Sequence, residues 1–121
     1  MRRVSTLLTT FATTVAFVGV VVAATPDDAA KLRSTGSCVG CDLFGENLSG
    51  VQAPNADLTN ANLGEAVLYA ANLSGANFTG ATLDGANFNM ANLEGATGVI
   101  FGTAQTDWRT TCPNGQAGPC Q

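Results

Sequence analysis

The sequence predicts an all-β repeat solenoid, and one regular spacing carries that prediction. From Cys41 to about Ile100 an apolar residue recurs every five positions, a period that fits neither an α-helix nor a flat strand. A small residue stands two places ahead of nearly every member, and no insertion interrupts the run. Units this short bury their apolar faces only by stacking on neighbouring units. The series is Leu43, Leu48, Ala53, Leu58, Leu63, Leu68, Leu73, Phe78, Leu83, Phe88 and Leu93.

Residues 1–24 have the pattern of a secretory signal: a basic start, an apolar run from Leu7 to Val22, and a small-residue exit with cleavage after Ala24. The alternative is an uncleaved membrane anchor, since the run approaches the roughly 18 apolar residues that span a bilayer. Threonines within the run favour cleavage. The Arg2-Arg3 pair lacks the surroundings of a twin-arginine signal. We expect an exported protein, periplasmic or extracellular, that contacts a membrane only if this segment remains attached.

Residues 25–40 form a polar lead and cap, in which residues 29–33 can make one helical turn that Gly36 ends. From residue 25 onward the chain holds three cations, Lys31, Arg33 and Arg109, against nine acidic residues. With no basic cluster, it lacks the charge pattern of a protein that binds nucleic acid or an anionic membrane.

The five-residue units at 41–100 include ENLSG, ADLTN, ANLSG and ANFTG. Their pattern, Ala-(Asn/Asp)-Leu-x-x, resembles the motif of the pentapeptide-repeat proteins over about sixty residues. The resemblance implies a right-handed quadrilateral β-helix of about three coils, in which each pentapeptide supplies one side and four make a coil. With twenty residues per coil, Leu48, Leu68 and Phe88 stack in one inner column.

The position before each bulky residue carries mostly Asn or Asp, whose side chains bond readily to nearby backbone groups. We interpret these residues as structural. Val67, Thr82 and Thr97 interrupt the series. Glycines close many units, where a turn needs backbone freedom. A phosphate-binding loop is disfavoured, because no strand–loop–helix setting or following Lys-Ser/Thr accompanies them.

The four cysteines form two local pairs, Cys38 with Cys41 before the repeats and Cys112 with Cys120 after them. In an exported chain an even count indicates disulfides. Of the three possible connectivities we favour bonds within each pair, because each pair lies at one end of the solenoid, where an open β edge needs blocking. Four-cysteine zinc binding is disfavoured by the same separation. Covalent haem would need histidine after the CxxC, where Asp42 stands. A thiol-redox role for Cys38 and Cys41 stays as an alternative.

Residues 101–121 form the C-terminal cap with its disulfide loop. Phe101 and Trp108 are the large groups available to cover the open end of the core. A Trp108 that stacks on carbohydrate or makes a dimer contact is the alternative. Several members of the resembled family dimerise through this end, which raises the second possibility.

The residue inventory argues against an enzyme, since the chain has no histidine and no nucleophile beside an evident base. We expect no cofactor, no metal site and no nucleic-acid partner. The expected function is a structural or protein-interaction module, which binds an unknown protein or itself. The candidate surface is Val67, Tyr69 and Met90, outward on the wall of Leu68, with Trp108 as a further candidate. The alternative is an acidic DNA mimic that binds a topoisomerase, as some acidic relatives do; the export signal and the scattered acids disfavour it.

Overall fold

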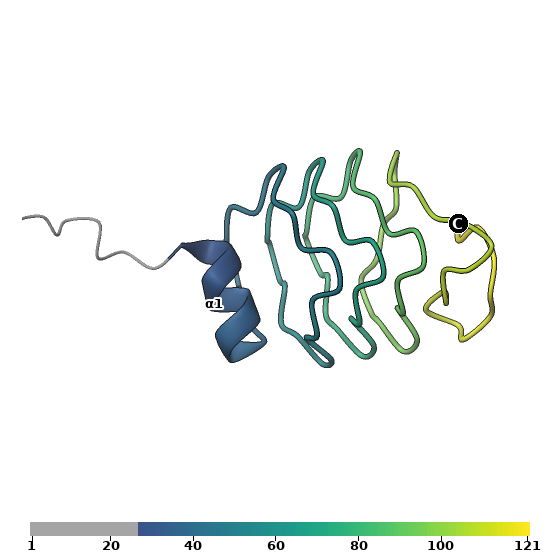
Figure 1. The fold of residues 1–121 in the computed structure, drawn as a ribbon, viewed down its shortest axis with the longest axis horizontal. Helices are drawn as coiled ribbons and strands as arrows, with labels where there is room; N and C mark the ends of the chain where they lie inside the picture. The colour runs from purple at the N-terminus through teal and green to yellow at the C-terminus, as the bar shows by residue number, and fades with distance from the viewer. Residues whose placement is uncertain (1–26) are drawn as a thin grey trace, which may run out of the picture.

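The computed structural model describes residues 27–121, and the expected signal segment, residues 1–24, lies outside them. Stacked coils form a short tube with helix α1 at one end and the C-terminal segment at the other (Figure 1). Helix α1, Asp28–Thr35, is the only helix in this described part of the chain. Across these residues no helix has both the length and the apolar character that crossing a membrane requires.

Helix α1 covers the first end of the tube. It begins where Asp27 accepts a hydrogen bond from the Ala29 N–H at 3.0 Å, and it ends at Gly36, whose backbone is left-handed (φ 71°). Ala29 and Leu32, three residues apart on one helix face, are buried. The expected helical turn is therefore present, extended by a residue before and two after.

The walls of the tube are ladders of parallel bridges, between residues twenty apart in all but the last two, and no extended strand forms within residues 27–121. Each pentapeptide supplies one bridge and one turn, so the chain changes direction every five residues. Four ladders give a four-sided tube. We name them in chain order: wall A joins Ser37, Asp57, Asn77 and Thr97; wall B joins Asp42, Asn62 and Thr82; wall C joins Asn47, Val67, Asn87 and Gln105; wall D joins Gln52, Asn72, Asn92 and Thr111.

The predicted apolar series lines the inside of the tube. All eleven members are at most 2% exposed, and the alanines two places ahead of them are mostly buried as well. Aromatic rings fill the C-terminal half of the core, where Phe88 packs edge-on against both Phe78 and Phe101 at centroid distances of 6.1 and 6.2 Å. The five-residue register deduced from the sequence is confirmed.

The Asn and Asp side chains shape the outside of each wall, as interpreted from the sequence. The Oδ1 atom of each accepts a hydrogen bond from the N–H two residues later, a local turn that repeats along every wall. The residues are Asp42, Asn47, Asp57, Asn62, Asn72, Asn77, Asn87 and Asn92.

The corner after each turn is left-handed. Glycine occupies many of these corners, where its lack of Cβ removes the steric penalty. Five corners carry other residues at φ between 56° and 65°: Asn55, Asn60, Glu65, Ala70 and Met90. Asn tolerates this conformation, but Ala and Met gain nothing local from it.

Two disulfides lie at the two ends of the tube. Cys38 is bonded to Cys41, and the Cys38 sulfur lies 3.3 Å from the Asp28 carbonyl of α1; Cys112 is bonded to Cys120 in the last segment. This is the pairing that position in the sequence favoured. The final segment then turns back on itself, since Thr111 and Ala117 form an antiparallel bridge.

Candidate interaction surface

The structure brings all four candidate surface residues to wall C. Val67 bridges Asn47 on one side and Asn87 on the other. The Ala70 N–H donates to the Asn89 carbonyl, which places Tyr69 one row before Met90. The next row begins at Gln105, which bridges Asn87. The Thr110 N–H donates to the Asp107 carbonyl as the Ala91 N–H donates to the Phe88 carbonyl, so Trp108 lies in the turn that stacks on the turn of Asn89 and Met90.

A shortened coil produces this placement of Trp108. The other parallel bridges join residues twenty apart, but Asn87 pairs with Gln105, eighteen residues later, and Asn92 pairs with Thr111, nineteen residues later. With the regular period, position 108 would stack inward on Phe88. The shortened coil moves it outward, and the Trp108 side chain is 72% exposed. The expectation that Trp108 covers the core is therefore wrong, whereas Phe101 is partly buried against it.

Wall C carries three of the exposed large apolar side chains in successive rows. Tyr69 is 40% exposed, Met90 36% and Trp108 72%, while Val67 is half-buried. We call these four residues the Trp108 surface. Other exposed apolar residues are separated from it: Val39 and Phe44 lie in the first coil on walls A and B, and Ile100 lies beyond the last bridge of wall A.

Asp107 holds the Trp108 corner in place. Its Oδ1 accepts hydrogen bonds from the backbone N–H groups of Met90 (3.1 Å) and Arg109 (3.0 Å), and from the Thr110 hydroxyl (3.1 Å). Its Oδ2 is paired with the Arg109 guanidinium at 2.9 Å. Thr110 is fully buried and also reaches the Phe88 carbonyl at 3.0 Å. The corner is therefore tied to both the row below and the core.

These contacts determine the charge state of Asp107. Desolvation raises its pKa, but the hydrogen bonds from Arg109, the Met90 N–H and Thr110 outweigh that effect and lower the pKa to about 2. The carboxylate is therefore ionised at neutral pH. The Arg109 guanidinium also lies 5.3 Å from the centre of the Trp108 ring, within cation–π range.

The walls differ in charge. Wall B and its corner carry Asp42, Glu65 and Asp84, all exposed. Wall C holds one acid among its outward residues, Asp107, and that acid forms the only ion pair of residues 27–121. A guanidinium lies at each end of wall C: Arg109 beside Trp108, and Arg33, which donates to the Asn47 carbonyl at 2.7 Å. Glu46 lies at the corner that leads into this wall and is half-buried.

The end of the tube that carries Cys38 and Cys41 is the main alternative to the Trp108 surface as a functional site. The Asp28 carboxylate and the sulfurs of Cys38 and Cys41 lie within 4.8 Å of one another, a ligand set that a metal ion could use. Both sulfurs are joined in a disulfide and both cysteines are buried beneath α1. A thiolate, not a disulfide sulfur, is the metal ligand and the nucleophile, so this end offers neither chemistry while the bond is intact.

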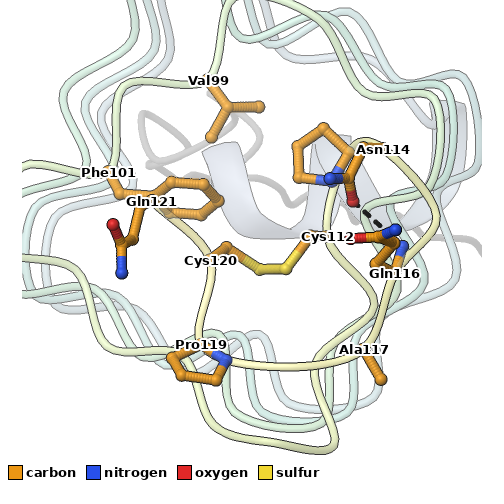
Figure 2. Close-up of a pocket in the computed structure, with 10 residues that line it drawn as sticks. Val99, Phe101, Cys112, Asn114, Gln116, Ala117, Pro119, Cys120 and Gln121 are labelled. Carbon is orange, nitrogen blue, oxygen red and sulfur yellow. Dashed lines mark hydrogen bonds between the residues drawn. A yellow bond between two sulfur atoms is a disulfide. The ribbon is translucent and has the colours of Figure 1, made fainter.

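The open C-terminal end contains a hollow of about 440 Å³. Val99 and Phe101 line one side and Asn114 and Gln116 the other, with the Cys112–Cys120 disulfide in the middle (Figure 2). Apart from the bonded cysteines, no lining side chain is ionisable. The hollow therefore lacks a paired acid and base for catalysis. The sequence did not indicate it, because it arises where the period ends.

The fold and these surfaces define a class of protein: over residues 27–121 it is a four-sided β-helical solenoid with an aromatic and apolar strip on one wall and exposed acids on another. The family follows from comparison with known proteins. The model of the pentapeptide repeats matches residues 37–68 and 61–97, and the chain belongs to that family. The family implies the right-handed quadrilateral β-helix that the sequence led us to expect.

Solved structures agree with this assignment. HetL, a pentapeptide-repeat protein involved in heterocyst differentiation regulation in the cyanobacterium Nostoc sp. PCC 7120, is 32% identical with a TM-score of 0.63. The match covers 69% of this chain but 39% of HetL, so the chain spans well under half the length of that relative. The pentapeptide-repeat protein alr5209 of Nostoc has the same fold, at 24% identity and a TM-score of 0.53, over 77% of this chain and 83% of its own. No curated protein matches the chain.

Proposed function

We propose that the protein is a non-catalytic binding module that recognises a partner protein through the Trp108 surface. The observation that carries the proposal is that Tyr69, Met90 and Trp108 lie in successive rows of one wall, each more than a third exposed. Clustered apolar side chains on a surface mark interaction sites more often than scattered ones do.

Met90 adds a second argument. It occupies a left-handed corner (φ 65°) where the preceding coils have Gly50 and Ala70, and where glycine would relieve the backbone. A large apolar residue at a strained and exposed position contributes little to the fold. Such residues are typical of functional sites, where binding offsets the strain.

A non-catalytic role is supported by the inventory of groups. The sequence contains no histidine, and the hollow at the C-terminal end has no ionisable pair. The proposal also places the protein outside the cytoplasm. The signal pattern of residues 1–24 and the two disulfides support that location, since disulfides persist in oxidising compartments.

Two double variants test the proposal. Val67→Asn with Tyr69→Ser removes apolar area from wall C, and Asn restores the usual residue of the repeat at position 67. The matched control is Thr82→Asn with Phe44→Ser on wall B, since Thr82 also interrupts the Asn series and Phe44 is 57% exposed. Tagged proteins are exposed to chemical cross-linking in the source cells, and cross-linked partners are quantified by mass spectrometry. We expect the wall C variant to lose a partner that the control retains.

Equal recovery of every partner by both variants would contradict the proposal. Tagged protein that stays in the cytoplasm with residues 1–24 intact would contradict the location and favour the duplex-mimic alternative, for which the acidic wall B would be the contact face. Free, reversible thiols at Cys38 and Cys41 would favour the redox alternative.

A further inference from the structure

The spacing of the Trp108 surface matches the repeat of an α-helix. Neighbouring rows of a β ladder lie about 4.8 Å apart, so Tyr69, Met90 and Trp108 climb the tube axis in steps of about 4.8 Å. The turns of an α-helix repeat every 5.4 Å or so. Same-face residues of an extended strand recur roughly every 6.7 Å, which is a poorer match. Over two steps, the helix is out of register by about 1 Å and the strand by about 4 Å.

The backbone N–H groups of wall C already donate hydrogen bonds to neighbouring rows, so they cannot pair with the backbone of an extended peptide. The N–H groups of Leu68, Ala70 and Phe88 all donate to carbonyls of the following row. A strand laid on this face would keep its own N–H and C=O groups without partners, which is costly wherever water is excluded. A helix satisfies its backbone internally and contributes only side chains.

The charges around the surface select the ends of such a helix. Arg33, at the first row of wall C, forms no ion pair within residues 27–121, whereas Arg109, at the last row, is already paired with Asp107. The two rows lie about 14 Å apart, the length of about ten helical residues. The neighbouring wall B presents Asp42, Glu65 and Asp84. A helix with an acidic end is therefore attracted to the Arg33 row of wall C and repelled by wall B, and a basic helix has the opposite preference.

From this spacing, pairing and charge we infer that the Trp108 surface binds an amphipathic α-helix of a partner protein, which lies along the tube axis with apolar residues at i, i+4 and i+7 and acidic residues at the end that meets Arg33. The inference rests on the proposed function and specifies its partner. Tyr69, Met90 and Trp108 each contact one turn. The corner positions of the earlier rows, Gly50 and Ala70, are small, so they leave room for the helix to approach.

Synthetic peptides test the inference on the full chain. The first peptide has leucines at i, i+4 and i+7 with glutamates at one end; the second has lysines in place of the glutamates; the third carries a central proline that breaks the helix. Trp108 is the only tryptophan of the protein, so its emission reports binding directly. We expect a blue shift with the acidic peptide, at least tenfold weaker binding of the lysine peptide at low salt, and no binding of the proline peptide at the same concentrations.

Variants separate this inference from the proposed function. Tyr69→Ser should weaken the acidic peptide at least fivefold, and Phe44→Ser should leave it unchanged. Equal binding of the proline or lysine peptide would overturn the inference, as would a Tyr69-dependent dimer of the protein itself in sedimentation. If no helical peptide binds at about 1 mM while cross-linking in cells still depends on wall C, the helix is wrong and the proposed function stands. If neither depends on wall C, both fail.

Discussion

The backbone N–H of Met90 donates to the carboxylate of Asp107, 3.1 Å away, whereas the equivalent N–H of Ala70 in the preceding row donates to the carbonyl of Asn89. A side chain has replaced a main-chain acceptor in the ladder. The corner that presents Met90 is therefore linked to a group whose charge can be titrated, and the same group fixes the loop that carries Trp108.

The pKa of Asp107 yields a pH prediction. Because its folded pKa, about 2, lies below the unfolded value, the ionised form stabilises the fold above about pH 4, and that contribution is lost as pH falls toward 2. Denaturant midpoints measured from pH 6 to pH 2 should fall more steeply for the natural protein than for Asp107→Asn. Parallel curves would show that Asp107 contributes nothing to this dependence. Asp57, whose pKa is lowered by its bonds to Thr59, titrates in both proteins and cancels in the difference.

The core allows a test of the register. Leu68→Ala or Phe88→Ala should cost roughly 2–5 kcal/mol of unfolding free energy, because a narrow tube cannot collapse around the gap. Ser74→Ala, on the outside of wall D, should cost little. Denaturant titration measures all three, and equal losses at inward and outward positions would refute the five-residue register.

The left-handed corners predict stabilising substitutions. Ala70→Gly should raise the unfolding free energy by about 1 kcal/mol or less, since relief of the backbone outweighs the extra entropy of the unfolded chain. Gly45→Ala is the matched reverse change: its φ is 69° and an added Cβ would meet no neighbour, so it should cost about 1 kcal/mol from the backbone alone. Thermal midpoints that move the other way would contradict the strain at these corners.

A substitution at Met90 should change stability and binding in opposite directions. Met90→Gly removes the strain but also removes an apolar side chain from the Trp108 surface. We expect a variant at least as stable as the natural protein that binds the partner, or the acidic peptide, more weakly. Unfolding curves and fluorescence titration measure the two properties on the same sample. A variant that binds with undiminished strength would remove Met90 from the surface.

The Cys112–Cys120 disulfide predicts which part of the protein unfolds first. Non-reducing mass spectrometry of the protein purified from its source cells should show a peptide that links Cys112 to Cys120 and no free thiol. Loss of that bond, as in Cys112→Ala with Cys120→Ala, should change Trp108 fluorescence at a lower denaturant concentration than the far-ultraviolet circular dichroism, because a solenoid unfolds from its ends. Bound zinc or a Cys38–Cys112 link would contradict the two-cap arrangement.

The contrast between Leu68 and Trp108 explains how far the sequence could be interpreted. Leu68 belongs to an uninterrupted period, and each repeat gives independent evidence for its inward position. Trp108 follows the segment between Thr97 and Gln105, where the coil loses two residues. Periodicity contains no information on such a deletion, so the tryptophan was expected on the core rather than beside Met90. The twenty-residue register alone assigns Asp42, Glu65 and Asp84 to one wall, whereas the Asp107–Arg109 ion pair lies beyond the last regular unit.

The twenty-residue spacing of most bridges means that the number of coils sets how far apart two residues of one wall lie along the tube axis. A coil inserted between the rows of Tyr69 and Met90 would leave both ends unchanged and would move Trp108 further along the same face by about 4.8 Å. Insertion of a single pentapeptide would instead turn everything beyond it by a quarter of the circumference, which would carry Trp108 to a different face from Tyr69. Gain or loss of whole coils can therefore match the reach of this surface to partners of different length, whereas gain or loss of single units would destroy it.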